Sequence, residues 1–89
     1  MITKQFTIIN KLGLHARAAA KFVSCASGFG SEIKVEKDGR QVNGKSIMGV
    51  MMLAASKNST ITVTVNGEDE NLAVDKIGEL ISNRFGENE

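Results

Sequence analysis

The segment STITVTV, residues 59–65, restricts the possible folds of this chain more than any other feature. Ile61, Val63 and Val65 alternate with threonines, which predicts a β-strand with one apolar face and one polar face. Strands of this kind need a covering layer on only one side of their sheet. We therefore expect a two-layer fold, with helices on one side of the sheet and solvent on the other.

The remaining patterns supply further strands and the covering helices. Residues 3–10 alternate like a strand, and residues 32–43 predict a β-hairpin around the turn signal Asp38-Gly39. Helical patterns occupy residues 16–27, 44–53 and 68–82. The element order β-α-β-β-α-β-α predicts an α+β fold, and the length of 89 residues leaves room for one domain, residues 1–89.

Apolar spacing also predicts which faces of the helices are buried. On the first helix the expected stripe consists of Ala16, Ala19, Ala20, Val23 and Ala26. On the last helix it consists of Ala73, Ile77, Leu80 and Ile81. The final segment NRFGENE, residues 83–89, is interpreted as a fraying end.

The composition argues against several classes of function. Eleven Lys and Arg residues against ten Asp and Glu residues give a formal charge of +1, and the four Phe residues are the only aromatic ones, so nucleic-acid binding is not expected. Apolar runs are far shorter than the roughly 20 residues of a membrane span, and MITKQFTII lacks the apolar core of a signal peptide. We expect a cytoplasmic protein without a membrane partner or a cofactor.

The single cysteine, Cys25, cannot form a disulfide within the chain. It is most simply a small buried apolar residue of the first helix. A reactive thiol is the alternative, but the chain has no second cysteine and no second histidine to activate it. One Cys and one His do not make a tetrahedral ligand set, so no metal site is expected.

The only histidine, His15, lies where a glycine-containing loop meets the first helix. A helix N-terminus offers unpaired N–H groups to an anion, and Arg17 adds a guanidinium that suits phosphate oxygens. A histidine that only packs or caps the helix is the alternative. A catalytic base would need further polar groups, which the sequence does not bring to it. The pattern favours an accessible imidazole that carries a phosphoryl group, in a carrier and not in a standalone enzyme.

Two motifs at their separation resemble a known family. GLHARAAAKF (13–22) followed by NGKSIMGVMML (43–53) resembles the histidine-containing phosphocarrier family, HPr, of the bacterial phosphoenolpyruvate-dependent phosphotransferase system. The resemblance extends over essentially the whole chain. It implies an open-faced β-sandwich, in which a four-stranded antiparallel sheet is covered on one face by three helices. It also implies that enzyme I phosphorylates His15 on Nδ1, and that the group then passes to a histidine of an enzyme IIA for sugar uptake.

The same resemblance assigns roles to the neighbours of His15. Arg17 matches the phosphate-stabilising arginine of the family, and the backbone N–H groups of Ala16 and Arg17 are implied to hold the phosphoryl oxygens. The family motif has a proline after the arginine, whereas this chain has Ala18. Alanine also suits a first helical turn, so we expect the chemistry to be kept.

The second motif contains a candidate regulatory site. Serine is a favoured N-cap, and Ser46 is expected to begin the second helix. The resemblance implies that HPr kinase/phosphorylase phosphorylates this serine. We expect Val50 and Leu53 to point inward. The resemblance also implies that this helix is a docking surface for enzyme I and enzyme IIA. Ile47, Met48 and Met51 are the candidates for its exposed apolar part, with a basic rim of Lys21 and Lys45.

Two alternatives to a monomeric sugar-type carrier stay open. One is the nitrogen-related paralogue branch (NPr-like), which relays phosphate to regulatory proteins. The other is a non-phosphorylated regulatory binding module on the same fold. The intact GKSIMG segment and the lack of a long acidic insertion argue against the first, and His15 together with Arg17 argues against the second.

Overall fold

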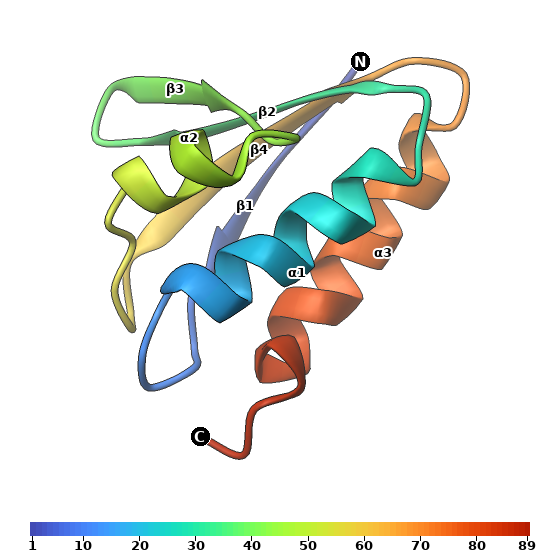
Figure 1. Ribbon diagram of the computed structural model, residues 1–89. Helices are drawn as coiled ribbons and strands as arrows, with labels where there is room; N and C mark the ends of the chain where they lie inside the picture. Colours follow the sequence, from blue (N-terminus) through green and yellow to red (C-terminus); the bar gives the residue numbers. More distant parts are fainter.

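The computed structural model describes residues 1–89 and contains four strands, three α-helices and a short 3-10 helix (Figure 1). The strands are β1 (Ile2–Thr7), β2 (Glu32–Lys37), β3 (Arg40–Asn43) and β4 (Thr60–Asn66). The helices are α1 (Ala16–Ser27), α2 (Ile47–Met52), α3 (Glu70–Ser82) and the 3-10 helix η1 (Arg84–Gly86). The predicted order of elements is confirmed, and η1 is an addition to it.

The strands form one antiparallel sheet in the order β1-β4-β2-β3. β4 is therefore an interior strand, paired with β1 on one side, where Val65 lies opposite Ile2, and with β2 on the other. β2 and β3 form the predicted hairpin. Its turn residues Asp38 and Gly39 have φ angles of 51° and 83°. A two-residue hairpin turn of type I′ requires such left-handed values at both positions.

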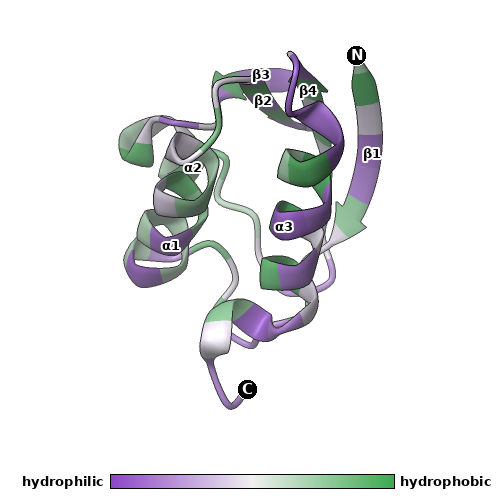
Figure 2. Ribbon diagram, turned by 90° about the vertical axis from the view of Figure 1, so that its right-hand side faces the viewer, coloured by the Kyte–Doolittle hydropathy of each residue, from purple (hydrophilic) through white to green (hydrophobic).

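The three α-helices cover one face of the sheet, which confirms the open-faced sandwich (Figure 1). Ile61, Val63 and Val65 of β4 are completely buried beneath them, whereas Thr60 is exposed. α1 and α3 show both hydrophobic and hydrophilic colours, as amphipathic helices do (Figure 2). Twenty buried apolar residues form one core between helices and sheet. None of the helices is long and apolar enough to cross a membrane.

The predicted buried stripe of α1 is partly wrong. The buried residues of this helix are Ala18, Ala19, Phe22, Val23 and Ala26. Ala16 and Ala20, which the spacing placed on the stripe, are exposed. A run of alanines does not determine which face of the helix turns toward the sheet. Phe22 determines it, because this large side chain would expose the most apolar surface to solvent if it faced outward. On α3, Leu80 is only partly buried, and Val74 is buried in addition to the predicted residues.

The C-terminal segment, residues 83–89, is not a fraying end, so this prediction is also wrong. Phe85 has no exposed surface and belongs to the core. Arg84, Phe85 and Gly86 have successive φ angles of 54°, 55° and 77°, so the chain turns through a run of left-handed residues. After this turn, Glu87 and Glu89 contact the loop that precedes α1.

The start of α3 is tied to the connection between α1 and β2. The Asp69 carboxylate accepts hydrogen bonds from the N–H groups of Gly30 and Ser31, at 2.9 and 3.0 Å, and from the Ser31 hydroxyl. The Ser31 hydroxyl, followed by the Gly30 N–H, lowers the pKa of Asp69 below its ordinary value. The ionised carboxylate thus links two segments that are far apart in the sequence.

Candidate functional site

His15 is placed by a tight loop between β1 and α1. Gly13 has a φ of 67°, and a side chain there would run into the carbonyl of Ala55 and the Cα of Ser56, which lies 2.8 Å from the ideal Cβ position. The next residue, Leu14, donates its backbone N–H to the same Ala55 carbonyl at 2.8 Å and buries its side chain. The loop is therefore fixed against the segment between α2 and β4, immediately before the histidine.

His15 is itself the N-cap residue of α1, with an extended backbone at φ −70° and ψ 178°. Its carbonyl accepts from the N–H of Ala19 at 2.8 Å, but its side chain makes no capping hydrogen bond. The imidazole is 28% exposed, so it is accessible to a partner without being free to rotate in solvent. The first N–H groups of a helix have no partners within it, and Ala16 and Arg17, which begin α1, line the same hollow as the imidazole.

Arg17 lies one residue beyond the start of α1 and is exposed. Its guanidinium forms none of the ion pairs in the structure. His15 and Arg17 line a common surface hollow together with neighbouring residues of the loop and helix and with the C-terminal segment: Lys11, Leu12, Ala16, Glu87, Asn88 and Glu89. The structure thus brings together the imidazole, a free guanidinium and a helix N-terminus, an arrangement that can bind an anion.

A carboxylate that the sequence patterns do not reveal also belongs to this site. Glu87 Oε2 lies within hydrogen-bond distance of His15 Nε2, and Glu87 Oε1 accepts from Asn10 Nδ2 at 2.9 Å. Burial alone would favour the neutral carboxyl, but the hydrogen bonds from Asn10 and His15 outweigh it. The pKa of Glu87 consequently lies below its ordinary value. Glu87 is an ionised partner of the imidazole.

Three further contacts hold the C-terminal segment in this position. Lys21 of α1 donates from Nζ to the carbonyl oxygen of Phe85 at 2.6 Å. Lys11 donates its backbone N–H to the carbonyl of Glu89, and its Nζ lies 3.3 Å from the Glu89 carboxylate. Residues 85–89 are therefore bound to both sides of the His15 loop.

Neither Glu87 nor Asn10 is predicted by local sequence patterns. Glu87 lies 72 residues from His15 in a polar segment that resembles a disordered end. The one available signal is Phe85, since a large aromatic residue in a segment otherwise made of polar residues and glycine indicates an attachment to the core. Asn10 follows a strand, where asparagine usually indicates only a turn.

The α2 helix carries the second candidate site. Ser46 is its N-cap, and the Ser46 hydroxyl accepts from the backbone N–H of Gly49 at 3.1 Å, as predicted. Val50 and Leu53 are buried, which is also as predicted. The exposed apolar residues of α2 are Ile47, Met48, Met51 and Met52, with exposed fractions of 44, 71, 38 and 59%. Because α2 packs beside α1, this apolar surface is on the helical side of the molecule.

The two lysines assigned to a basic rim are both engaged with the main chain. Lys21 binds the carbonyl of Phe85, and Lys45 donates from Nζ to the carbonyl of Phe29 at 2.7 Å. Phe29 follows the C-terminus of α1, whereas His15 precedes its N-terminus, so the structure does not place Lys45 with the histidine. Their contribution to partner binding stays a prediction.

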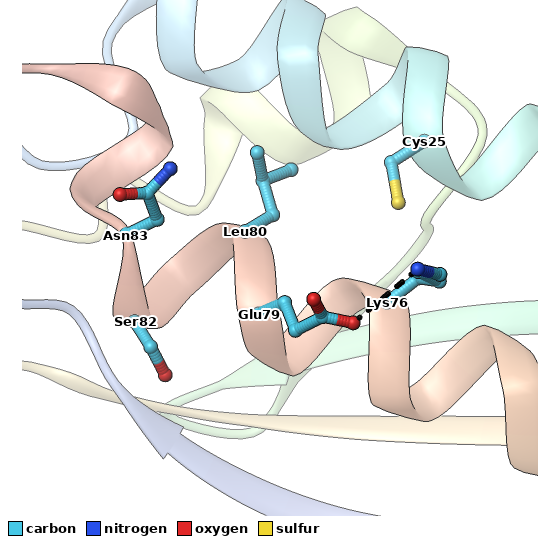
Figure 3. Close-up of a pocket in the computed structure, with 6 residues that line it drawn as sticks. All are labelled: Cys25, Lys76, Glu79, Leu80, Ser82 and Asn83. Atoms are coloured by element: carbon cyan, nitrogen blue, oxygen red, sulfur yellow. Dashed lines mark ion pairs between the residues drawn. The ribbon is translucent and has the colours of Figure 1, made fainter.

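Cys25 is partly exposed and packs against the core from α1. Its side chain points toward α3 across a shallow pocket that also contains Leu80, Lys76 and Glu79, the last two of which form an ion pair at 3.5 Å (Figure 3). Burial raises the pKa of the thiol, which disfavours the reactive thiolate. The structure shows no group of three or more potential metal ligands among His, Cys, Asp and Glu side chains.

Comparisons with known proteins agree with this arrangement. A family model described as "PTS HPr component phosphorylation site" matches residues 2–83. The chain is 56% identical to the phosphocarrier protein HPr of Cupriavidus necator, over the whole of both chains. Among solved structures it is similar to HPr from Thermoanaerobacter tengcongensis, with a TM-score of 0.96, 46% identity and complete coverage of both chains. An HPr dimer from the same organism matches with a TM-score of 0.79 and 47% identity, over 98% of this chain and 100% of that one.

Proposed function

Because this chain belongs to the HPr family of phosphocarrier proteins of the phosphotransferase system, we propose that His15 carries the phosphoryl group. The observation that supports this most directly is the hollow that His15 shares with Arg17 at the start of α1. We propose that the group arrives from phosphorylated enzyme I and leaves to a histidine of an enzyme IIA, in the service of sugar uptake.

In the proposed transfer, the lone pair of His15 Nδ1 attacks phosphorus while the bond from phosphorus to the donor nitrogen breaks. The donor nitrogen keeps the electron pair of that bond, so the phosphoryl group moves without an oxidant or a cofactor. The N–H groups of Ala16 and Arg17 and the Arg17 guanidinium donate hydrogen bonds to the phosphoryl oxygens and stabilise their negative charge. Transfer to enzyme IIA is the same step in reverse order, with His15 as the donor.

The protein acts here as a carrier and not as an enzyme that turns over a substrate of its own. Its groups bind and orient the phosphoryl group, and the partner enzymes supply the remainder of each transfer site. We propose that it works in the cytoplasm as a monomer made of a single domain, residues 1–89.

The exposed apolar residues of α2 are the proposed docking surface for these partners. Ile47, Met48 and Met51 lie on a helix that packs beside α1, whose first turn contains the proposed phosphate site. Methionine side chains adapt to surfaces of different shape, which suits a protein that must bind both a donor and an acceptor. Lys21 and Lys45 are proposed to add positive charge at the edge of this surface.

We further propose that Ser46 is phosphorylated by an HPr kinase/phosphorylase. The hydroxyl that now caps α2 would then bear a charge of about −1.5 to −2. A helix N-terminus tolerates this charge, but an acidic partner that docks on α2 would be repelled. Phosphorylation at Ser46 would thus lower the rate of transfer to and from His15 without unfolding the helix.

The decisive experiment is phosphorylation of the purified chain with phosphoenolpyruvate, Mg²⁺ and enzyme I, followed by measurement of the intact mass. We expect an acid-labile gain of one phosphate, absent in His15→Ala. Arg17→Glu should slow transfer strongly, whereas the charge reversal Lys34→Glu, on the open face of the sheet, should not. If the wild type gains no phosphate, or if His15→Ala still gains it, the carrier function is rejected, and a non-phosphorylated binding module becomes the better interpretation.

A further inference from the structure

A second surface hollow adjoins the hollow that contains His15. Three segments far apart in the sequence line it: Ile9 and Lys11, then Lys57 and Asn58, and finally Arg84, Asn88 and Glu89. Figure 1 shows these segments at the end of the molecule where the C-terminus lies. Lys11, Asn88 and Glu89 line both hollows, so a molecule that covers the first can also reach the second.

The folded backbone holds Lys57 and Arg84 at this second hollow. Next to Lys57, the N–H of Asn58 donates to the carbonyl of Ile8 at 2.7 Å, which attaches this loop to the residue after β1. Next to Arg84, the side chain of Phe85 is completely buried in the core. The two residues therefore meet at one place because the fold brings them there, although both carry a positive charge.

Neither of these cations has an acidic partner within the molecule. Lys57 and Arg84 are exposed, and neither belongs to any ion pair of the structure. Glu89 is the only residue with a carboxylate side chain that lines the second hollow, and its carboxylate lies 3.3 Å from the Lys11 ammonium. Like charges at one place repel each other, so an incoming negative group would be attracted to this hollow.

The hollow suits the carboxylates of a protein surface better than a single small anion. None of its lining residues is buried, and an exposed ion pair contributes little on its own. A protein surface can meet Lys57 and Arg84 together with Arg17 of the adjoining hollow. Several such charges act together when they guide two proteins toward each other, because their fields add over the surface.

From these observations we propose that Lys57 and Arg84 form a docking surface for acidic side chains of a protein that exchanges a phosphoryl group with His15. None of the exposed apolar residues of α2 lines this hollow, so the contact with the partner extends beyond α2. Charges of this kind act mainly on the rate at which two proteins meet. The identity of the partner rests on the proposed function, whereas the attraction of acidic side chains to the hollow does not.

The attraction is tested by ¹⁵N-resolved NMR of the unphosphorylated chain, titrated with hexaglutamate at low salt. We expect the backbone amide signals of Lys57, Asn58 and Arg84 to shift, and the shift of Asn58 to disappear in Lys57→Gln/Arg84→Gln. Inorganic phosphate at the same concentration is the comparison and should shift these signals less. The proposal is overturned if hexaglutamate leaves the three signals in place, or if phosphate shifts them as strongly, which would indicate a site for small anions.

The same double variant is then compared with the wild type in the second-order rate constant for phosphoryl acceptance from phosphorylated enzyme I. At about 0.01 M salt, where charges act over about 30 Å, we expect a loss of about fivefold. At about 1 M salt, where this distance falls to about 3 Å, the two proteins should react equally fast. The rate at saturating concentration should not change, because neither residue lines the hollow that contains His15.

Lys34→Gln/Lys76→Gln is the matched control, since it removes the same two charges from the open face of the sheet and from α3. The proposal is overturned if this control loses as much rate, if Lys57→Gln/Arg84→Gln loses none at low salt, or if its loss is the same at both salt concentrations. A wild type that accepts no phosphate would instead reject the carrier function. The hexaglutamate titration would then still decide whether the hollow attracts acidic side chains.

Discussion

Replacement of Phe85 by alanine tests whether the C-terminal segment is part of the core. Phe85 has no exposed surface, and its loss removes a large apolar side chain from the cluster beneath the helices. Truncation of a buried Phe to Ala typically costs about 3–5 kcal/mol. Phenylalanine and alanine carry the same backbone cost at a φ of 55°, so the change in the free energy of unfolding reports the packing of the ring.

This cost is large for a chain of 89 residues, whose total free energy of unfolding is expected to be about 4–13 kcal/mol. We expect Phe85→Ala to lower the midpoint of urea unfolding markedly and to reduce Tm by roughly 10 °C or more. Far-UV circular dichroism across a urea series gives the free energy, and a thermal scan gives Tm. Leu72→Ala, on an exposed part of α3, is the control and should change the free energy by only about 0.5 kcal/mol. A loss below about 1 kcal/mol in Phe85→Ala would refute the reasoning, because that is the result a fraying end would give.

Three further substitutions test other parts of the structure. Gly13→Ala should lower the free energy of unfolding by about 1–3 kcal/mol in urea titrations, since it places a side chain at a left-handed φ and against the carbonyl of Ala55. Ser46→Ala should cost about 1 kcal/mol through the lost N-cap of α2, whereas Ser46→Asp keeps an acceptor and should cost less. Asp69→Asn should make stability fall less steeply as the pH is lowered into the acid range, measured as the midpoint of urea unfolding at several pH values. The folded pKa of Asp69 is lowered, chiefly by the Ser31 hydroxyl, so its stabilisation is present above the ordinary pKa of 3.8 and is lost as the pH falls through the folded pKa.

Each of these has a result that contradicts it. A Gly13→Ala variant as stable as the wild type would show that the loop before His15 can relax. Equal stability of Ser46→Ala and the wild type would mean that the cap adds nothing to α2. An Asp69→Asn variant that loses stability in acid as steeply as the wild type would assign the acid dependence to other carboxylates.

The strands and the hairpin could be predicted because their signals are local. The alternation in residues 59–65 and the Asp38-Gly39 pair each determine a conformation within a few residues, and tertiary contacts do not override them. The face of α1 was harder to predict. Ala16, Ala18 and Ala20 are the same residue type, so apolar spacing alone cannot say which of them faces the sheet.

The candidate site was predictable only in part for a different reason. His15 and Arg17 lie two residues apart at a helix start, which is a local pattern. Glu87 reaches the same site through three successive left-handed residues, of which Arg84 and Phe85 have no intrinsic preference for that conformation. The burial of the Phe85 side chain and the contacts of Lys11 and Lys21 hold the chain in this path, and all of these are properties of the complete fold.

The position of β4 in the interior of the sheet bears on the order in which the molecule assembles. The pairing of β4 with β1 joins segments more than fifty residues apart, and the contact between His15 and Glu87 joins residues 72 apart, so both require a long loop to close. Closing so long a loop is slower than forming a helix, so α1 can form early while the imidazole still lacks its carboxylate. During refolding, the contact between His15 and Glu87 would thus form during the slow closure of these long loops. A chain stopped before that step would show helical circular dichroism, but its His15 side chain would lack the Glu87 carboxylate.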